Sequence, residues 1–476
     1  MAQVDFADGQ AHRAYASVAL GLRILQAAGL NKDKYASSFS SSEMEARRRV
    51  AWAFFMLDRT YSASRDYSLC LSDKHFTLPF PSPNMEEAPG MEESYSRGTL
   101  HDGQGKEGEK VDHGILACLL RLYSLWGKAT EYVLEPLDKD ALPPWHTGST
   151  LAMLESEWLQ FETHFADKHR YLNVDFQRRA REKPECRGYL STWVCVQFLF
   201  HSIQCLLYHP FVLMVKVRHM KGNLSTTFLQ KSHENSLLHS RWIVRFIKEM
   251  NEVDFHLYDP FLGHLAAIAA TIQLEHTVSK NPQVSQTISS EFKMLVDFMA
   301  SLSERWENMR VLVDRVNELA ARHHNYGSLF YDRDGYSGAL SSMPTPSNIP
   351  RMSAEDEALM WDILDFGSSC TTSETTQLGD LIPSQSQGHH IESRPAQNVP
   401  DLPLPVSTEN GENDRNVYQK GPAIPEDIPS PPPYGQVPES IGEDPIPGWT
   451  LPDANGNGGL DFPDWLILGG DMAEHL

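Results

Sequence analysis

Cysteine is scarce in this sequence, with six residues in 476, and no two of them are spaced as Cys-x-x-Cys. Such wide spacing in a long chain is typical of free thiols in a reducing compartment. It predicts neither a disulfide framework nor a metal cluster, so we expect no cofactor in this chain. The six are Cys70, Cys118, Cys186, Cys195, Cys205 and Cys370.

Several other signals are missing. The first residues, MAQVDFADGQ, have neither a basic start nor an apolar run, so no signal peptide is predicted. We find no uncharged apolar stretch of the roughly 18 residues that a membrane span needs, so we expect no membrane contact. Gly-x4-Gly-Lys-Ser/Thr, Gly-x-Ser-x-Gly and His-Glu-x-x-His are absent. The sequence therefore predicts a protein that is not an enzyme.

Basic charge is also in short supply, and the acidic excess is uneven. The chain has 41 Lys and Arg against 63 Asp and Glu, a net charge of −22. Residues 341–476 hold 22 of the acids, 4 of the bases and 19 of the 30 prolines. Such a composition cannot bury enough apolar surface to offset the entropy of ordering. We expect a disordered acidic tail over residues 336–476, and no basic domain that would bind nucleic acid.

The rest of the chain shows helical periodicity and almost no alternation of period two. We expect an all-α, multi-helix domain over residues 1–335, with a mobile, Gly- and Glu-rich loop at about 84–110. The expected helices cover 12–30, 42–62, 111–133, 148–165, 188–219, 226–251, 260–278 and 289–321.

Two patterns resemble metal sites but lack the required context. His201, Cys205 and His209 share a helical face, yet the outer pair would lie about 12 Å apart along a helix, too far for one zinc ion. Residues 453–464, DANGNGGLDFPD, match several positions of a calcium loop. Pro452 and Pro463 argue against the flanking helices that such a loop needs. We expect no metal at either place.

Residues 43–62, EMEARRRVAWAFFMLDRTYS, combine an arginine triplet with an apolar helix. Ser42 and Glu45 fit a capping box, and apolar residues cover most of the helix surface, which predicts a buried helix. Glu43 and Glu45 precede Arg47 and Arg49 by four residues, the favourable order for ion pairs. We therefore interpret the triplet as the charged start of a buried helix rather than as a DNA-binding surface.

This stretch resembles the regulatory, or middle homology, region of fungal zinc-cluster regulators, called the fungal-specific transcription factor domain. Later segments, LLRLYSLWGKATEYV, LLYHPFVL and DPFLGHLAAIAATIQLEH, follow in the expected order, so the resemblance covers about residues 10–325. A Gly-Arg-Pro common after the Asp-Arg pair is replaced by Ser64-Arg65-Asp66. The motif residues, to which we assign a structural role, are Arg47, Arg48, Arg49, Trp52, Leu57, Asp58, Arg59, Leu78 and Pro79.

The resemblance implies a nuclear regulator of RNA polymerase II genes, of metabolism or secondary metabolism, with shuttling to the cytoplasm and homodimers left open. Family members also carry an N-terminal six-cysteine cluster that binds zinc and reads DNA, but no cysteine precedes Cys70. Either the gene model is truncated, or the protein reaches promoter DNA through a partner as a co-regulator. A different class, an all-α sensor of a small molecule, remains an alternative because a pocket in a helical bundle needs no motif.

The tail contains motifs for protein partners. Pro431, Pro432, Pro433 and Tyr434 fit the Pro-Pro-x-Tyr ligand of WW domains, with a plain proline-rich spacer as the alternative. Two acidic segments rich in large apolar residues, 355–367 and 459–471, are candidate activation segments that would bind coactivators. The alternative for the first is a helix packed on the body. Their apolar residues include Leu359, Trp361, Ile363, Leu364, Phe366, Phe462, Trp465 and Leu466.

Overall fold

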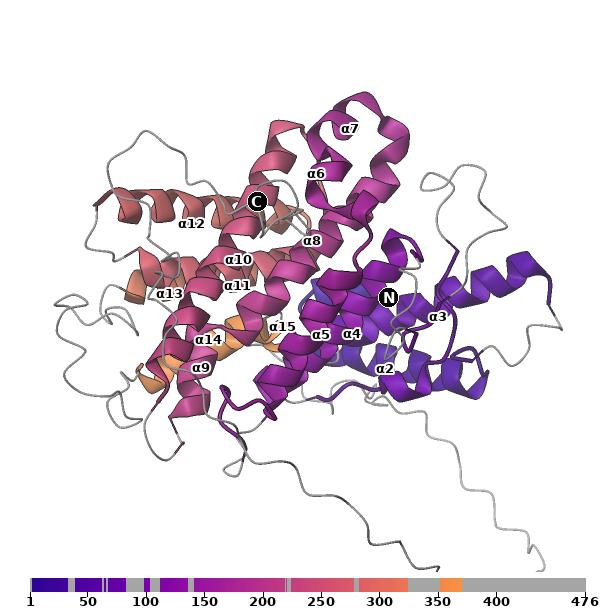
Figure 1. Cartoon of the computed structure of the whole chain (residues 1–476), viewed down its shortest axis with the longest axis horizontal. Helices are drawn as coiled ribbons and strands as arrows, with labels where there is room; N and C mark the ends of the chain where they lie inside the picture. Colours follow the sequence, from indigo (N-terminus) through magenta and orange to yellow (C-terminus); the bar gives the residue numbers. More distant parts are fainter. Residues whose placement is uncertain are drawn as a thin grey trace, which may run out of the picture. The chain divides into compact units, whose positions relative to one another are not determined.

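The computed structural model describes residues 2–32, 39–61, 64–65, 67–82, 98–102, 112–135, 141–218, 220, 224–277, 282–323 and 352–369. Over these ranges every regular element is a helix, as expected from the apolar spacing, and this confirms the predicted all-α class (Figure 1). The described residues belong to one unit of the chain, and their buried apolar side chains form one core that runs from Phe6 to Phe366.

The first helices are α1 (Ala2–Ala7), α2 (Ala11–Ala27) and α3 (Ser41–Tyr61). The chain leaves α2 at Gly29, whose φ of 68° lies in the left-handed region that glycine adopts without strain. A capping box does start α3, but it is formed by Ser40 and Glu43, two residues earlier than predicted. The shift leaves Glu45 free to accept a hydrogen bond from the backbone N–H of Ser82 and to pair with two arginines of its own helix, described below.

The middle of the body consists of α4 (Ile115–Leu134), α5 (Thr150–His164), α8 (Arg187–Leu207) and α9 (Pro210–Val217). The helix predicted over 188–219 is divided, because Pro210 cannot donate a backbone hydrogen bond and starts α9 as its first residue. Short elements connect α5 to α8: η3 (Asp167–His169), α6 (Tyr171–Val174), α7 (Phe176–Glu182) and η4 (Pro184–Cys186).

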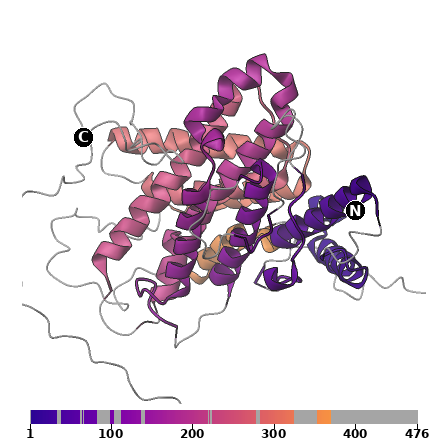
Figure 2. The same cartoon turned by 45° about the vertical axis from the view of Figure 1, so that its right-hand side comes forward.

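Four longer helices complete this part: α10 (Thr226–Glu252), α11 (Pro260–His276), α12 (Pro282–Ser303) and α13 (Glu307–His323). Every residue of α11 is buried, because α8, α10, α12 and α13 all contact it (Figures 1 and 2). The predicted helix over 289–321 is also divided: α12 ends at Ser303 and α13 begins at Glu307.

The statement that no apolar stretch is as long as a membrane span is wrong. The stretch Pro184–Val217, which includes α8 and α9, is long and apolar enough by composition to cross a membrane. Its most apolar window is 94% buried inside the protein, so these residues form the centre of the helical core. Within the described residues no other stretch passes the same test.

The boundary predicted at residue 336 is also incorrect for the first part of the tail. After residues 324–351 the chain forms α14 (Ala354–Leu364) and α15 (Phe366–Ser369). These two helices contact α11, α13 and α3, and they lie among those helices in both views (Figures 1 and 2). Residues 352–369 therefore belong to the helical body, whereas the prediction for 370–476 lies outside the described residues.

Candidate functional site

The arginine triplet at the start of α3 makes contacts within the protein. Glu45 forms ion pairs with Arg48 and Arg49, both at 3.0 Å. Arg48 is buried, and Arg49 donates to the carbonyl oxygen of Ser82. The guanidinium of Arg47 lies over the ring of Phe39, 3.6 Å from the ring centre. These contacts favour the interpretation of the triplet as part of a structural helix.

Trp52 connects α3 to the segment that contains Leu78 and Pro79. Its indole N–H donates to the carbonyl oxygen of Pro79 at 2.9 Å, and its ring packs against Phe76 and Phe80. Leu78 is buried, so residues 76–80 follow the surface of α3 closely. A buried indole needs a partner for its N–H, and the carbonyl of Pro79 provides it.

Asp58 and Arg59 form the centre of a buried network at the end of α3. The Asp58 carboxylate accepts hydrogen bonds from the backbone N–H groups of Cys70 and Leu71 and from the Arg59 guanidinium. Arg59 also donates to the carbonyl oxygen of Leu71 and to Asp73 of η2 (Asp73–His75). Both Asp58 and Arg59 are at most 1% exposed, and such buried charges are stable only when paired.

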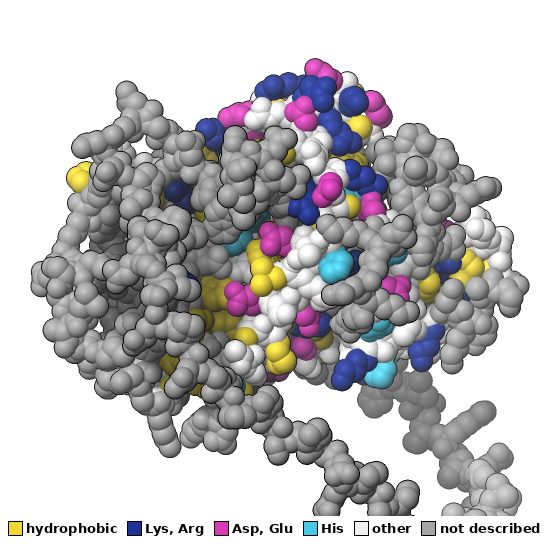
Figure 3. All heavy atoms as spheres, in the orientation of Figure 1, with side chains coloured by type: hydrophobic (Ala, Val, Ile, Leu, Met, Phe, Trp, Pro, Cys, Tyr) yellow, Lys and Arg dark blue, Asp and Glu magenta, His cyan; other side chains and the backbone are white. Residues whose placement is uncertain are grey.

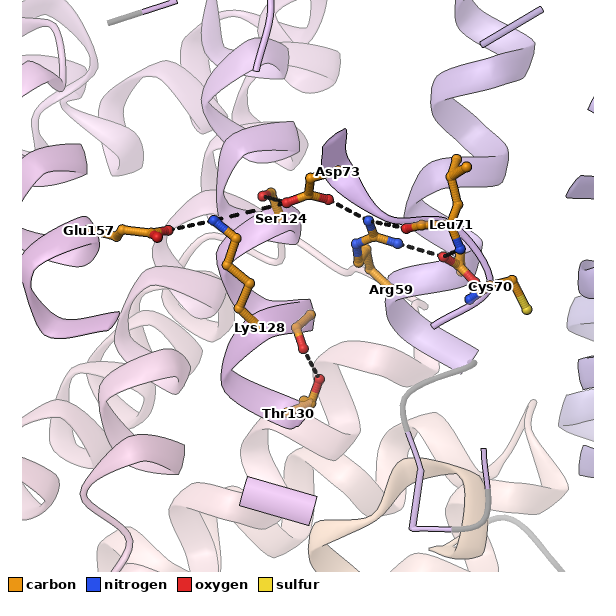
Figure 4. A network of polar contacts seen from close by, with 10 residues as sticks. Arg59, Cys70, Leu71, Asp73, Ser124, Lys128, Thr130 and Glu157 are labelled. Carbon is orange, nitrogen blue, oxygen red and sulfur yellow. Dashed lines mark hydrogen bonds and ion pairs between the residues drawn. The ribbon is translucent and has the colours of Figure 1, made fainter. Parts of the chain in front are cut away.

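The network continues from Asp73 into two further helices (Figure 4). Ser124 of α4 donates to Asp73, and Lys128 of α4 lies 4.0 Å from Asp73 and 2.7 Å from Glu157 of α5. Close approach of α3 and α4 depends on Gly127, where a Cβ atom would lie 2.4 Å from Cδ of Arg59. The network therefore holds α3, η2, α4 and α5 at fixed distances.

This arrangement is suited to a structural role. Each charged group in it faces an opposite charge or a backbone group, and Asp73, to which the Ser124 hydroxyl donates, is itself paired with Arg59. Leu57, the remaining motif residue, is half-buried and packs against the core. Sequence reasoning missed Ser124, Lys128 and Glu157. The signal available for the first two was a pair of polar residues four positions apart on a mostly apolar helix.

The suspected zinc residues have separate partners. His201 lies with its Nδ1 atom 2.8 Å from Nδ1 of His239, Cys205 faces the carbonyl of Ser236, and His209 pairs with Thr271. Burial lowers the pKa of His209 and of His239 to about 3, so both are neutral at physiological pH. Among the described residues there is no cluster of three or more side chains that could hold a metal ion.

The first candidate activation segment lies in the core. Ile363, Leu364 and Phe366 are each at most 3% exposed, and Leu359 is 9% exposed. Phe366 packs against Phe6, Tyr61, Phe261 and His264, from three different helices. Trp361 is half-buried, with its ring 4.9 Å from that of Phe211. In this structure the segment is therefore a helix packed on the body, which was the alternative interpretation of its sequence.

Other predicted features lie outside the described residues: Pro431, Pro432, Pro433 and Tyr434, the second activation segment with Phe462, Trp465 and Leu466, and the calcium-like loop. The same is true of most of the loop predicted at 84–110. On the face drawn in Figure 3, acidic and basic side chains are interspersed over the described surface.

Comparison with known proteins adds a family relationship. The family model described as the fungal specific transcription factor domain matches residues 6–209. A Zn(2)-C6 fungal-type transcription factor of Fusarium oxysporum f. sp. lycopersici, FTF1c, is 21% identical over 380 residues, which are 76% of this chain and 38% of that protein. FTF2 of the same organism is 21% identical over 75% of this chain and 33% of its own length.

A relative from Schizosaccharomyces pombe, described as the uncharacterized transcriptional regulatory protein C530.11c, is 22% identical over 58% of this chain and 35% of its own length. The chain thus spans between about a third and two-fifths of the length of these relatives. No solved structure matches the chain.

Proposed function

Residues 6–209 of this chain form a fungal-specific transcription factor domain, and on that premise we propose that the protein regulates transcription by RNA polymerase II in a fungal nucleus. The observation that carries the proposal is this domain match, and the similar curated proteins agree with it, because they are named as transcription factors or as a transcriptional regulatory protein. Those relatives are not described as enzymes, in agreement with the prediction of no catalytic activity. We further propose that the target genes belong to metabolism or secondary metabolism.

In this proposal the helical body is a regulatory scaffold. Two of its motif residues, Asp58 and Arg59, are the centre of a buried network that joins four elements, α3, η2, α4 and α5. Contact with promoter DNA, and the zinc that the relatives' Zn(2)-C6 name implies for them, would come from residues outside this chain or from a partner protein. Two observations support this: the cysteines are widely spaced, and the chain carries a net charge of −22.

Recruitment of coactivators is assigned to the acidic segments that follow α13. Large apolar side chains among carboxylates can be captured by a groove on a partner that folds the segment on contact, while the acids steer the encounter with a basic rim. Trp361 and Phe366 of the first segment and Phe462 and Trp465 of the second are the expected anchors.

A reporter experiment tests this proposal. Residues 341–476 are fused to an unrelated DNA-binding domain, and transcription of a reporter gene is measured in a fungal host. We expect activation that falls to background when Trp361, Phe366, Phe462 and Trp465 are all replaced by alanine. In the matched control, alanine replaces four acidic or polar residues of 341–476 that lie outside the segments 355–367 and 459–471. A silent fusion, or one indifferent to the four changes, would remove the support for an activator.

A further inference from the structure

The helices α2 and α3 form a hairpin at one edge of the molecule (Figures 1 and 2). Among the described helices, the main contacts of α2 are with α1 and α3. The hairpin is closely packed at Gly21, where a Cβ atom would lie 2.3 Å from the ring of Phe54. Its helices run antiparallel, because Tyr15 near the start of α2 contacts Cys70, whose backbone N–H donates to Asp58 near the end of α3.

Each of these two helices is apolar on two faces. The outer face is exposed to solvent, with Leu20 at 63%, Ile24 at 61% and Val50 at 49% exposure. A surface helix usually carries polar residues opposite the core, and an exposed apolar face indicates an interaction site. The inner face is buried in the core through Ala14, Val18, Leu22 and Leu25 of α2 and Ala51, Trp52 and Phe55 of α3.

The exposed apolar residues have the spacing of a seam between packed helices. They recur at steps of three and four residues, as they do along a coiled coil. Small and large side chains are mixed along both helices, so a second pair of helices can approach closely. This outer face consists of Ala16, Leu20, Ile24 and Ala27 on α2 and of Ala46, Val50, Ala53 and the half-buried Leu57 on α3.

The two ends of the outer face carry opposite charges. Arg13 precedes the apolar stripe of α2 and is 53% exposed, although it also lies 3.4 Å from Asp5, and the exposed Glu43 precedes the stripe of α3. Along the helix axes, Arg13 lies about 12 Å from Gly21 in one direction, and Glu43 lies about 16 Å from Phe54 in the other. A two-fold axis near the contact of Gly21 with Phe54 therefore brings the Arg13 end of each copy to the Glu43 end of the other. Such a face is self-complementary, as a two-fold dimer requires.

The size of the outer face indicates how strong such a dimer is. The 17 residues of α2 span about 25 Å, and two adjacent helices are roughly 20 Å wide. The face therefore covers about 500 Å² per copy, near the lower limit for a specific interface. Arg23 and Arg49 at its border are bound within their own helices by Gln26 and Glu45. We expect reversible pairing at micromolar concentrations.

We infer that the outer face of α2 and α3 binds the same face of a second copy of this chain, so that the two hairpins form an antiparallel four-helix bundle. Burial of Leu20, Ile24 and Val50 supplies the apolar contact, and attraction between Arg13 and Glu43 sets the orientation. The proposed function does not require this dimer, so each can fail without the other.

Sedimentation equilibrium of the purified full chain tests the inference, over about 1 to 100 µM, a range chosen for a weak interface. We expect a monomer–dimer equilibrium. In Leu20→Glu and in Val50→Glu the dissociation constant should rise at least about tenfold, because each variant places two carboxylates, one from each copy, in an apolar contact. Leu159→Glu is the matched control, since Leu159 is 48% exposed on a different helix, α5, and it should leave the constant unchanged.

Cross-linking locates the interface. Ala53→Cys places a thiol beside Phe54, near the expected axis, so a short bismaleimide should join two copies of this variant. Met153→Cys, at a side chain 55% exposed on α5, should give only the background of the unsubstituted chain. Circular dichroism should show the same helix content and thermal midpoint in every variant.

Two results would overturn the inference. The first is a chain that stays monomeric over the whole concentration range, which would leave the outer face to a different partner. The second is a dimer whose dissociation constant is unchanged in folded Leu20→Glu and Val50→Glu. If either variant unfolds, Ala53→Arg takes its place, because Ala53 is exposed and a long charged side chain there separates the two hairpins.

Discussion

Arg59 shows what a buried charge contributes to this molecule. Its guanidinium is enclosed by Asp58, Asp73 and the carbonyl oxygen of Leu71, and its face lies 4.2 Å from the ring centre of Phe55. Such a pair adds little net stability compared with a well-packed apolar core, but removing one partner leaves an uncompensated charge. The network therefore acts mainly by fixing the relative positions of α3, η2, α4 and α5.

Asp58→Ala should reveal this dependence. The substitution leaves Arg59 buried with one fewer partner and leaves two backbone N–H groups, of Cys70 and Leu71, without their acceptor. We expect the free energy of unfolding to fall by about 3–5 kcal/mol, measured by urea denaturation followed by tryptophan fluorescence. Asp297→Ala, which breaks the exposed pair with Lys293, should cost under about 1 kcal/mol. Equal losses for both variants would contradict the assignment.

Gly127→Ala tests the close approach of α3 and α4. The new methyl group would lie 2.4 Å from Cδ of Arg59, whose guanidinium is fixed by three partners and cannot move aside freely. Overpacking of this kind costs about 1–3 kcal/mol of unfolding free energy. At Gly148 the nearest atom would be 3.4 Å away, so Gly148→Ala should leave the urea midpoint almost unchanged. A neutral Gly127→Ala would show that α4 can move away from α3.

At the scale of elements, amphipathic spacing alone left two outcomes open for residues 355–367. A transient helix captured by a partner and a helix docked on the body require the same pattern of apolar residues. The difference lies in the receiving surface, and Phe211, Phe261 and His264, which contact the segment, come from α9 and α11. These residues are far from 355–367 in the sequence, so the local pattern of the segment could not show what it packs against.

The Pro431–Tyr434 segment is proposed to bind a WW domain. Consecutive prolines favour the extended left-handed helix that such domains recognise, and the tyrosine fills an aromatic-lined groove. A purified WW domain from a ubiquitin ligase should bind a peptide that spans this segment, and Tyr434→Ala should abolish the binding measured by calorimetry. A Tyr418→Ala change in a longer peptide is the control for loss of any tyrosine. Equal binding by the Tyr434→Ala peptide would refute the motif.

At the scale of the whole molecule, six of the seven histidines that are buried among the described residues make the fold sensitive to acid. Burial lowers the pKa of each: to about 3 for His209, His239, His264 and His276, to about 4 for His233, and well below the usual value for His201. Since the unfolded chain binds these protons near pH 6.5, it holds more protons than the folded chain below that pH. Stability is therefore present above about pH 6.5 and is lost as the pH falls.

His264→Phe should weaken this acid dependence. His264 is buried beside Trp126, Phe261 and Phe366, where an apolar ring of similar size fits. The slope of unfolding free energy against pH reports how many more protons the unfolded chain binds than the folded chain. Between pH 6.5 and 5 this number should decrease by about one in the variant. An unchanged slope in His264→Phe would mean that this histidine is not a neutral group in the folded state.

The charge of the whole chain gives a prediction about DNA. With a net charge of −22 and no Cys-x-x-Cys, the purified chain should show no sequence-specific DNA binding at physiological salt. Specific complexes typically form at about 10⁻⁸ M or tighter. A gel-shift comparison of promoter and scrambled DNA at nanomolar protein measures this. Retention of one promoter fragment over the scrambled control would overturn it.

The sequence by itself determined the helical class, most helix positions and the resemblance of the Arg47–Pro79 motif to a known domain. These follow from local pattern, because apolar spacing, caps and Gly29 act within a few residues. Pro210 is also a local signal for a helix start, although the helix predicted over 188–219 runs through it.

Only the tertiary structure decided which charges are buried and where residues 352–369 lie. Arg48 is buried and Arg49 is not, although they are neighbours with the same side chain, because only one of them faces the core. Ser124, Lys128 and Glu157 join the network through contacts between helices distant in sequence. Likewise, α14 is held by contacts with α11 and α13, which precede it by many residues. Burial and pairing of this kind depend on long-range packing, which no local periodicity encodes.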